Sequence, residues 1–258
     1  MSQLKNGSIT NQAAADDYLE MINLLQSLYH QGLNHSQFKS VLKNMEDAVS
    51  GYYGCVYYGE TPVEVGKREQ MILGSFALDM SEFLDKAPDY IKRKASDILG
   101  YAMPLLANSS TKSELKYILF SLTESKDDLS RFYAVKSLGQ LAKSSFNPVE
   151  QDEIVRKISG LIDDENMLVT GCAVQTLENV LSSIEIEHML RDEIILNLIN
   201  LYARSLYYPV SSYLTDCLRA LVGNEPDKWR KPIVEILGKY HIIDRDSTLS
   251  YIFDEEKY

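Results

Sequence analysis

The chain has 258 residues, 45% of them hydrophobic and 24% charged, and its formal net charge is −11. That hydrophobic share can fill a large core, so intrinsic disorder is not expected as the main state, and no apolar run reaches the length of a membrane helix. The negative charge argues against nucleic acid as the main ligand, because nucleic-acid binders gain affinity by neutralising phosphates, and it favours a basic protein partner or simply solubility.

The first predicted elements are two helices within residues 13–49. Their apolar residues return at helical spacing: Leu19, Ile22, Leu25 and Leu28 in the first helix, and Phe38, Val41, Leu42, Met45 and Val49 in the second. The first seven residues lack the apolar run of a secretory signal. Residues 1–67 are therefore predicted to form an N-terminal helical cap that ends in a loop.

That loop, residues 51–62, interleaves four tyrosines with three glycines, a composition that does not suit a stable helix. Tyrosine offers a rigid, amphipathic surface that protein partners use well. We therefore consider Tyr52, Tyr53, Tyr57 and Tyr58 as candidate partner-binding residues. The alternative, a loop that folds back and packs over the first repeat, stays open.

An internal repeat follows. Three segments that begin at Ala95, Ala134 and Ala173 align without gaps at a spacing of 39 residues, and each has a leucine four positions after the alanine. Residues four apart share one face of a helix. A fourth copy follows at a spacing of 41, with Leu214 and Leu218 in the two places.

Each copy is preceded by a polar turn and, before that, by another apolar helical stretch. The unit is therefore a helical hairpin of about 40 residues. The turns at residues 125–128 and 163–166 contain Asp and Asn, whose side-chain oxygens can cap the following helix. Pro104 and Pro148 are predicted to lie between hairpins, where a helix can begin but not continue.

The pattern is carried by Asp128, Arg131, Ala134, Val135, Leu138 and Leu141 in the second copy, and by Asp89, Arg93, Ala95, Ile98 and Leu99 in the first. These residues resemble the HEAT repeat, a family that places an Asp in the turn and an Arg or Lys early in the second helix. The third copy keeps Asp164 but has Val169-Thr170-Gly171 in place of the basic residue. The resemblance covers about residues 68–222 and implies an all-α fold, a right-handed α–α superhelix of about five to six hairpins.

The chain is predicted to end in a C-terminal cap, residues 223–258. Trp229, Ile233, Ile236 and Leu237 give residues 227–239 the spacing of a strong helix, and an acidic tail follows. Before this cap, Tyr207 and Tyr208 form a second group of tyrosines beside the fourth hairpin, and they are further candidates for partner binding. Two unrelated packed loops are the alternative interpretation.

Acidic residues gather between Glu150 and Glu193, where eleven Asp or Glu face three Lys or Arg, a net charge of −8. The candidate partner-binding residues in this stretch are Asp163, Asp164, Glu165, Glu185 and Glu187. One interpretation is a set of solvated helix starts and outer faces. The other is an acidic patch that steers a basic protein toward the concave face of the stack.

No pattern indicates a catalytic residue, a metal site or a cofactor. The four histidines, His30, His35, His188 and His241, lack the i, i+4 spacing of a helical metal site. The three cysteines, Cys55, Cys172 and Cys217, are odd in number and far apart, which indicates reduced, buried thiols in a cytoplasmic protein.

The sequence therefore predicts a non-enzymatic scaffold that binds a basic protein, with a bacterial immunity-type inhibitor of a toxin as one concrete form. Two other hypotheses stay open. One is an enzyme of this fold, either a lyase of the phycobilin-attachment type or a HEAT-like DNA glycosylase, and the small basic cluster around Lys92-Arg93-Lys94 is the sequence support for the glycosylase. The other is a structural subunit of a larger complex.

Overall fold

Helices are the regular elements in the part of the chain that the computed structural model describes, and no strand occurs there. The described residues are 67–106, 109–145, 147–204 and 225–239, with parts of 40–50 and 214–222. The helices are α3 (Lys67–Lys86), α4 (Asp89–Leu105), α5 (Ser109–Leu122), α6 (Asp128–Ser144), α7 (Pro148–Ser159), α8 (Met167–Leu181), α9 (His188–Arg204) and α11 (Pro226–Lys239). None of these helices combines the length and the apolarity that crossing a bilayer requires. The predicted all-α fold is confirmed.

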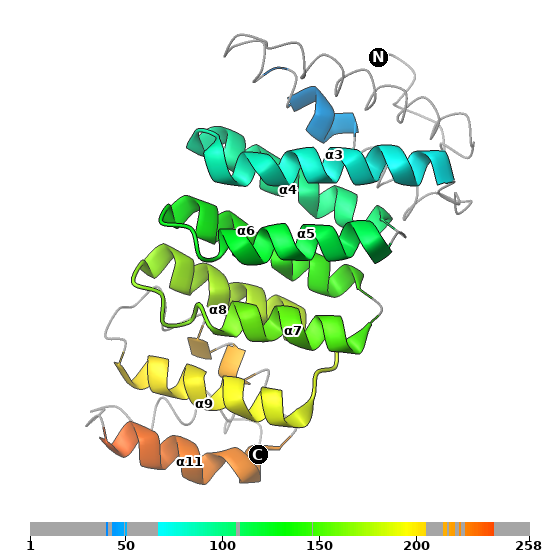
Figure 1. The fold of residues 1–258 in the computed structure, drawn as a ribbon. Helices are drawn as coiled ribbons and strands as arrows, with labels where there is room; N and C mark the ends of the chain where they lie inside the picture. Colours follow the sequence, from blue (N-terminus) through cyan, green and yellow to red (C-terminus); the bar gives the residue numbers. More distant parts are fainter. Residues whose placement is uncertain are drawn as a thin grey trace, which may run out of the picture. The chain divides into compact units, whose positions relative to one another are not determined.

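The chain divides into two compact units, residues 1–137 and 138–258, with the boundary inside α6. In the first unit, α3 packs against α4, its partner in a hairpin, and against α5, which opens the next hairpin. Figure 1 shows α3 and α5 side by side in one layer and α4 behind them. Hairpins therefore stack edge to edge, each covering the apolar side of its neighbour.

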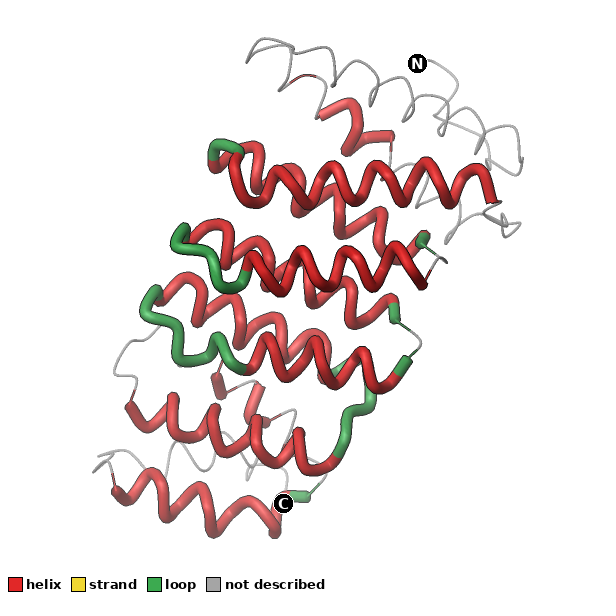
Figure 2. The backbone as a smooth tube through the Cα atoms, in the orientation of Figure 1, coloured by secondary structure: helices red, strands yellow, loops and turns green. Residues whose placement is uncertain are grey.

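The second unit repeats this arrangement. Helix α7 packs against α8 within its hairpin and against α9 of the next one, and α9 packs in turn against α11. The turns after α3, α5 and α7 are short loops, drawn green in Figure 2. The predicted domain boundaries at residues 67 and 222, and the predicted right hand of the superhelix, stay predictions.

The 39-residue repeat appears in the structure as equivalent buried positions. Ala95, Ala134 and Ala173 are fully buried, and so are the leucines four residues after each of them. In the fourth copy, Leu214 and Leu218 are buried as well. The sequence prediction of the core is therefore confirmed in all four copies.

Polar side chains begin the helices as expected. The side chains of Asn147 and Asn166 accept hydrogen bonds from the backbone N–H groups of Val149 and Leu168, which caps α7 and α8. Pro148 is the first residue of α7, as predicted. The prediction for Pro104 is wrong, because this residue lies inside the last turn of α4. Proline has no N–H to donate to the carbonyl of Gly100, four residues earlier, and α4 ends one residue after it.

The basic residue of the repeat is placed differently from the prediction in the first copy. Arg131 is buried and donates hydrogen bonds to the carboxylate of Asp128 and to the carbonyl of Ser125. The position 39 residues earlier is Lys92, which is also buried, whereas the predicted Arg93 is exposed. Lys92, not Arg93, is therefore the structural counterpart of Arg131.

The third copy keeps part of this arrangement without a basic residue. Thr170, 39 residues after Arg131, donates from Oγ1 to the carbonyl of Asp164 at 3.1 Å. Asp164 is likewise 39 residues after Ser125, so the two side chains hold equivalent loop carbonyls. A short hydroxyl thus replaces the guanidinium at the point where the sequence departs from the HEAT pattern.

Candidate partner-binding site

The structure places the predicted acidic residues of the second unit in two groups. Asp163, Asp164 and Glu165 lie in the turn that joins α7 to α8. Glu185 and Glu187 lie in the segment that joins α8 to α9. The two groups flank the fifteen residues of α8, a helix about 22 Å long. The five residues therefore do not form one site.

The first group takes part in holding the turn together. Asp163 pairs with Arg204 of α9 at 2.6 Å, and Asp164 accepts a hydrogen bond from the backbone N–H of Asn166 at 2.8 Å. A small pocket of about 270 Å³ lies beside these residues. Glu165 is exposed. The side chains of Asp163 and Asp164 thus make contacts within the fold that stabilise the turn and its packing against α9.

The second group belongs to a larger set of carboxylates, which we call the acidic edge. It consists of Glu150, Asp152, Glu153, Glu178, Glu185 and Glu187. Three come from the first two turns of α7, one from the last turn of α8, and two from the segment between α8 and α9. The backbone N–H of Glu187 donates to Asp152 Oδ1 at 3.3 Å, which ties that segment to α7.

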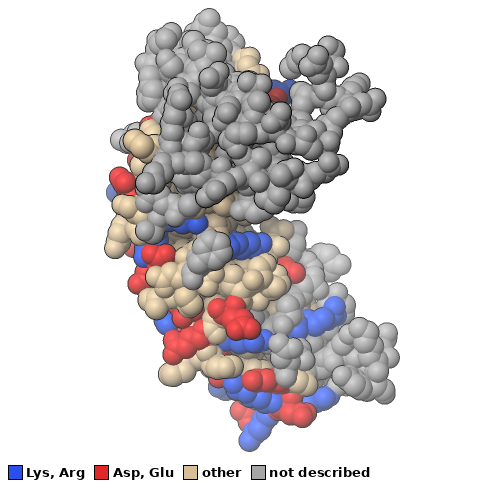
Figure 3. Space-filling view, turned by 90° about the vertical axis from the view of Figure 1, so that its right-hand side faces the viewer, with Lys and Arg blue, Asp and Glu red and all other residues tan. Residues whose placement is uncertain are grey.

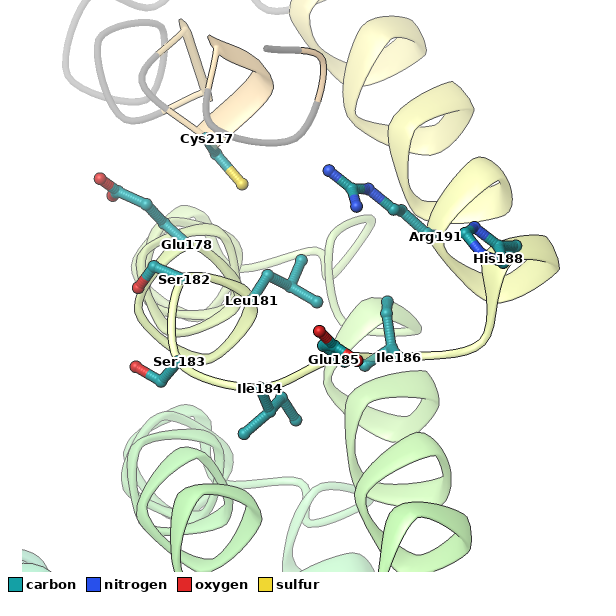
Figure 4. A pocket seen from close by; sticks show the side chains of 10 residues that line it. All are labelled: Glu178, Leu181, Ser182, Ser183, Ile184, Glu185, Ile186, His188, Arg191 and Cys217. Atoms are coloured by element: carbon teal, nitrogen blue, oxygen red, sulfur yellow. The ribbon is translucent and has the colours of Figure 1, made fainter. Parts of the chain in front are cut away.

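A pocket of about 650 Å³ lies at the acidic edge. It is lined by Glu178, Leu181, Ser182, Ser183, Ile184, Glu185, Ile186, His188, Arg191 and Cys217. Figure 4 shows the segment from Ser183 to His188 running along the pocket from the end of α8 to the start of α9. Arg191 extends from α9 toward the space between the two helices, and the sulfur of Cys217 points into the pocket.

Charged side chains reach the pocket from several elements. Carboxylates enter from α8 and from the following segment, and the guanidinium of Arg191 enters from α9. Among the described residues, no group of three or more His, Cys, Asp or Glu is placed to hold a metal ion. Cys172 and Cys217 are both buried thiols, as the sequence predicts. The excess of carboxylates along the edge suits a cationic ligand.

Next to the acidic edge, ion pairs join helices of successive hairpins in the second unit. Arg156 pairs with Glu193 at 3.1 Å, and Lys228 pairs with Asp192 at 2.8 Å. Hydrogen bonding to Asp192 raises the pKa of Lys228. Figure 3 looks onto the side where α7 and α9 begin, which is also the side of the acidic edge, and there red and blue side chains lie close together among the described residues. The carboxylates of Asp192 and Glu193, which lie close to the acidic edge in sequence, are therefore balanced by neighbouring cations.

Neither the scan against protein-family models nor the search of curated proteins finds a match. Solved structures do match over almost the whole chain. Two engineered proteins from the Northeast Structural Genomics Consortium have TM-scores of 0.53 and 0.52 and identities of 13% and 15%, and each match covers 92% of this chain and 95% or 93% of the other. A designed armadillo repeat protein, solved with the peptide (KR)4, has a TM-score of 0.51 and an identity of 14%, over 92% of this chain and 98% of its own. The chain has the armadillo/HEAT-like helical repeat fold.

In this armadillo/HEAT-like repeat, the predicted site residues have different outcomes. Tyr52, Tyr53, Tyr57, Tyr58, Tyr207 and Tyr208 lie outside the described residues. Glu185 lines the pocket, and Glu187 follows it on the acidic edge. The sequence interpretation did not select Glu178 and Arg191, which line the same pocket. Glu178 could have been selected from the sequence, because it lies near the C-terminal end of a predicted helix, just before the segment that carries Glu185.

Proposed function

We propose that this protein is a non-enzymatic scaffold that binds a basic protein partner along the acidic edge of its second unit. The observation that carries the proposal is the acidic edge, six carboxylates from α7, α8 and the following segment, of which Glu178 and Glu185 line a pocket of about 650 Å³. Carboxylates gathered on one edge attract and orient a cationic surface.

A solved structure of similar fold supports this proposal. The designed armadillo repeat protein with a similar fold was solved in complex with (KR)4, a basic peptide. This kind of helical stack can therefore hold a basic chain. A basic toxin or nuclease is one concrete form of the partner, and the acidic charge of the chain is what favours it. The buried thiols of Cys172 and Cys217 fit a reducing compartment such as the cytoplasm.

The proposal predicts that removing acids from the edge weakens the binding of a basic probe. The double substitution Glu185→Gln with Glu187→Gln is expected to lower the affinity for an alternating Lys-Arg octapeptide about threefold to tenfold, because two exposed carboxylates lose their charge. The salt dependence of binding should flatten as well. Fluorescence anisotropy of a labelled peptide, measured over a series of salt concentrations, checks both results.

Two controls separate the edge from the overall charge. Asp163→Asn removes a charge in the other group, beyond the length of α8, and at physiological salt it should leave the affinity within about twofold of the wild type. Arg156→Gln releases Glu193 from its ion pair and should raise the affinity about twofold. Equal affinities and salt slopes for the wild type and the double variant would exclude the acidic edge as the binding surface.

A further inference from the structure

Two exposed apolar side chains lie at the starts of α7 and α9, next to residues of the acidic edge in sequence. Val149 is 65% exposed and Met189 is 76% exposed. Single exposed apolar residues are ordinary on a protein surface. These two, however, occupy the same position in successive hairpins, because each is the second residue of its helix, α7 or α9. Such repetition makes them candidates for one continuous contact.

The surroundings of the two residues are also alike. Glu153 follows Val149 by four residues and Glu193 follows Met189 by four, so each apolar side chain shares a helix face with an exposed carboxylate one turn away. The helices α7 and α9 pack against each other, and the pair between Arg156 and Glu193 joins their outer faces. The edge thus presents apolar side chains among carboxylates, in the same order on both helices.

We infer that the acidic edge binds an amphipathic basic segment of the partner, whose apolar side chains contact Val149 and Met189 while its cations meet Glu153, Glu185 and Glu187. The inference rests on the proposed function and names the kind of segment that the edge recognises. Carboxylates accelerate the encounter, but exposed charge pairs add little affinity and are screened by salt. Burial of apolar surface supplies the part of the affinity that salt does not remove.

The test compares two synthetic lysine peptides of equal length and charge, one with serine spacers and the other with leucine spacers. The wild type should bind the leucine peptide about tenfold more tightly, and this preference should persist at high salt. The double variant Val149→Ser with Met189→Ser should reduce the preference to about twofold or less, while its affinity for the serine peptide stays unchanged. Met71→Ser, which alters an equally exposed methionine on α3, should leave the preference intact.

The outcomes separate this inference from the proposed function. If the wild type binds both peptides equally and the Glu185 and Glu187 variant still binds more weakly, the inference is overturned and the proposed function stands. If neither peptide nor the Lys-Arg octapeptide binds, the proposed function fails and the inference with it. If light scattering shows a wild-type dimer that Val149→Ser with Met189→Ser dissociates, the surface belongs to a second copy of the chain and the inference is wrong.

Discussion

Replacing Asp127 by asparagine is expected to lower the free energy of unfolding at pH 7 by about 1–2 kcal/mol, and replacing it by alanine by about 2–3 kcal/mol. Asp127 lies just before α6 and pairs with the ammonium group of Lys92 in α4. Its carboxylate also accepts hydrogen bonds from the backbone N–H and the hydroxyl of Ser130, and the N–H bond caps the helix. Asparagine keeps the cap and removes only the charge, whereas alanine removes both.

The cost arises mainly at Lys92, whose side chain is only 5% exposed while that of Asp127 is 47% exposed. Without the carboxylate, the buried ammonium group of Lys92 still donates a hydrogen bond to the hydroxyl of Ser130, at 2.8 Å. A buried charge that loses its counter-ion is strongly destabilising. We place the estimate below the usual range for buried pairs because water reaches half of Asp127.

A double-mutant cycle measured by urea denaturation isolates this pair. Lys92→Met removes the buried charge, so in that background Asp127→Asn should cost about 0.5 kcal/mol or less. The pair between Lys136 and Asp97, 2.7 Å apart in the same unit, is the matched control, because the side chain of Lys136 is 43% exposed. Its cycle should give a coupling below about 1 kcal/mol. Equal couplings for the two pairs would contradict the role that we assign to the burial of Lys92.

The same pair predicts a pH dependence. Partial burial alone would raise the pKa of Asp127, but the hydrogen bonds from Lys92 and Ser130 outweigh it and lower the pKa from 3.8 to about 2. Because the folded-state pKa is depressed, the contribution of Asp127 to stability is complete above about pH 4 and is lost as the pH falls toward 2. The difference in urea midpoint between the wild type and Asp127→Asn should therefore shrink across this interval. A constant difference down to pH 2 would contradict the assignment.

The core was predictable because burial leaves a period in the sequence. The spacing of Ala95, Ala134 and Ala173 in the sequence predicts the buried face of the second helix in each hairpin, and all three residues are buried in the structure. The same spacing, applied strictly, would also have aligned Lys92 with Arg131 and corrected the choice of Arg93. In α11 the helical spacing of the buried residues Trp229 and Ile233 predicts a helix, and the helix forms although Pro232 lies inside it.

The site was predictable only in part, because closeness in sequence is not closeness in space. Asp163 and Glu185 belong to one acidic stretch of the sequence, yet α8 separates them. Ion pairs such as that between Arg204 and Asp163 join residues of different hairpins. Which side chains pair in this way depends on how far one hairpin is shifted along the next. The period of the repeat does not give this shift to within one helical turn. For this reason the sequence predicted the net charge of the region better than its distribution.

The approach of α6 to α8 in the second unit is expected to make Gly139→Ala destabilising by about 1–3 kcal/mol. A Cβ added at Gly139 would overlap with Cγ2 of Thr176, a branched side chain that cannot swing away freely. Alanine is normally the better helix former by nearly 1 kcal/mol, so the clash must exceed that gain. Gly171 in α8 is the matched control, because a Cβ there meets nothing within 4 Å. Gly171→Ala should therefore stabilise the protein by about 0.5–1 kcal/mol.

A rescue experiment distinguishes this clash from other effects of the substitution. Thr176→Ser removes only the methyl group that the new Cβ would meet and keeps the hydroxyl, which lies 3.9 Å from the sulfur of Cys172. Gly139→Ala combined with Thr176→Ser should recover most of the lost stability, measured by thermal and urea unfolding. If Gly139→Ala alone is as stabilising as Gly171→Ala, α6 and α8 do not approach as closely at this point as the structure places them. Because each hairpin is covered only by its neighbours, a change in this helix spacing would also shift α9 and the pocket that it lines.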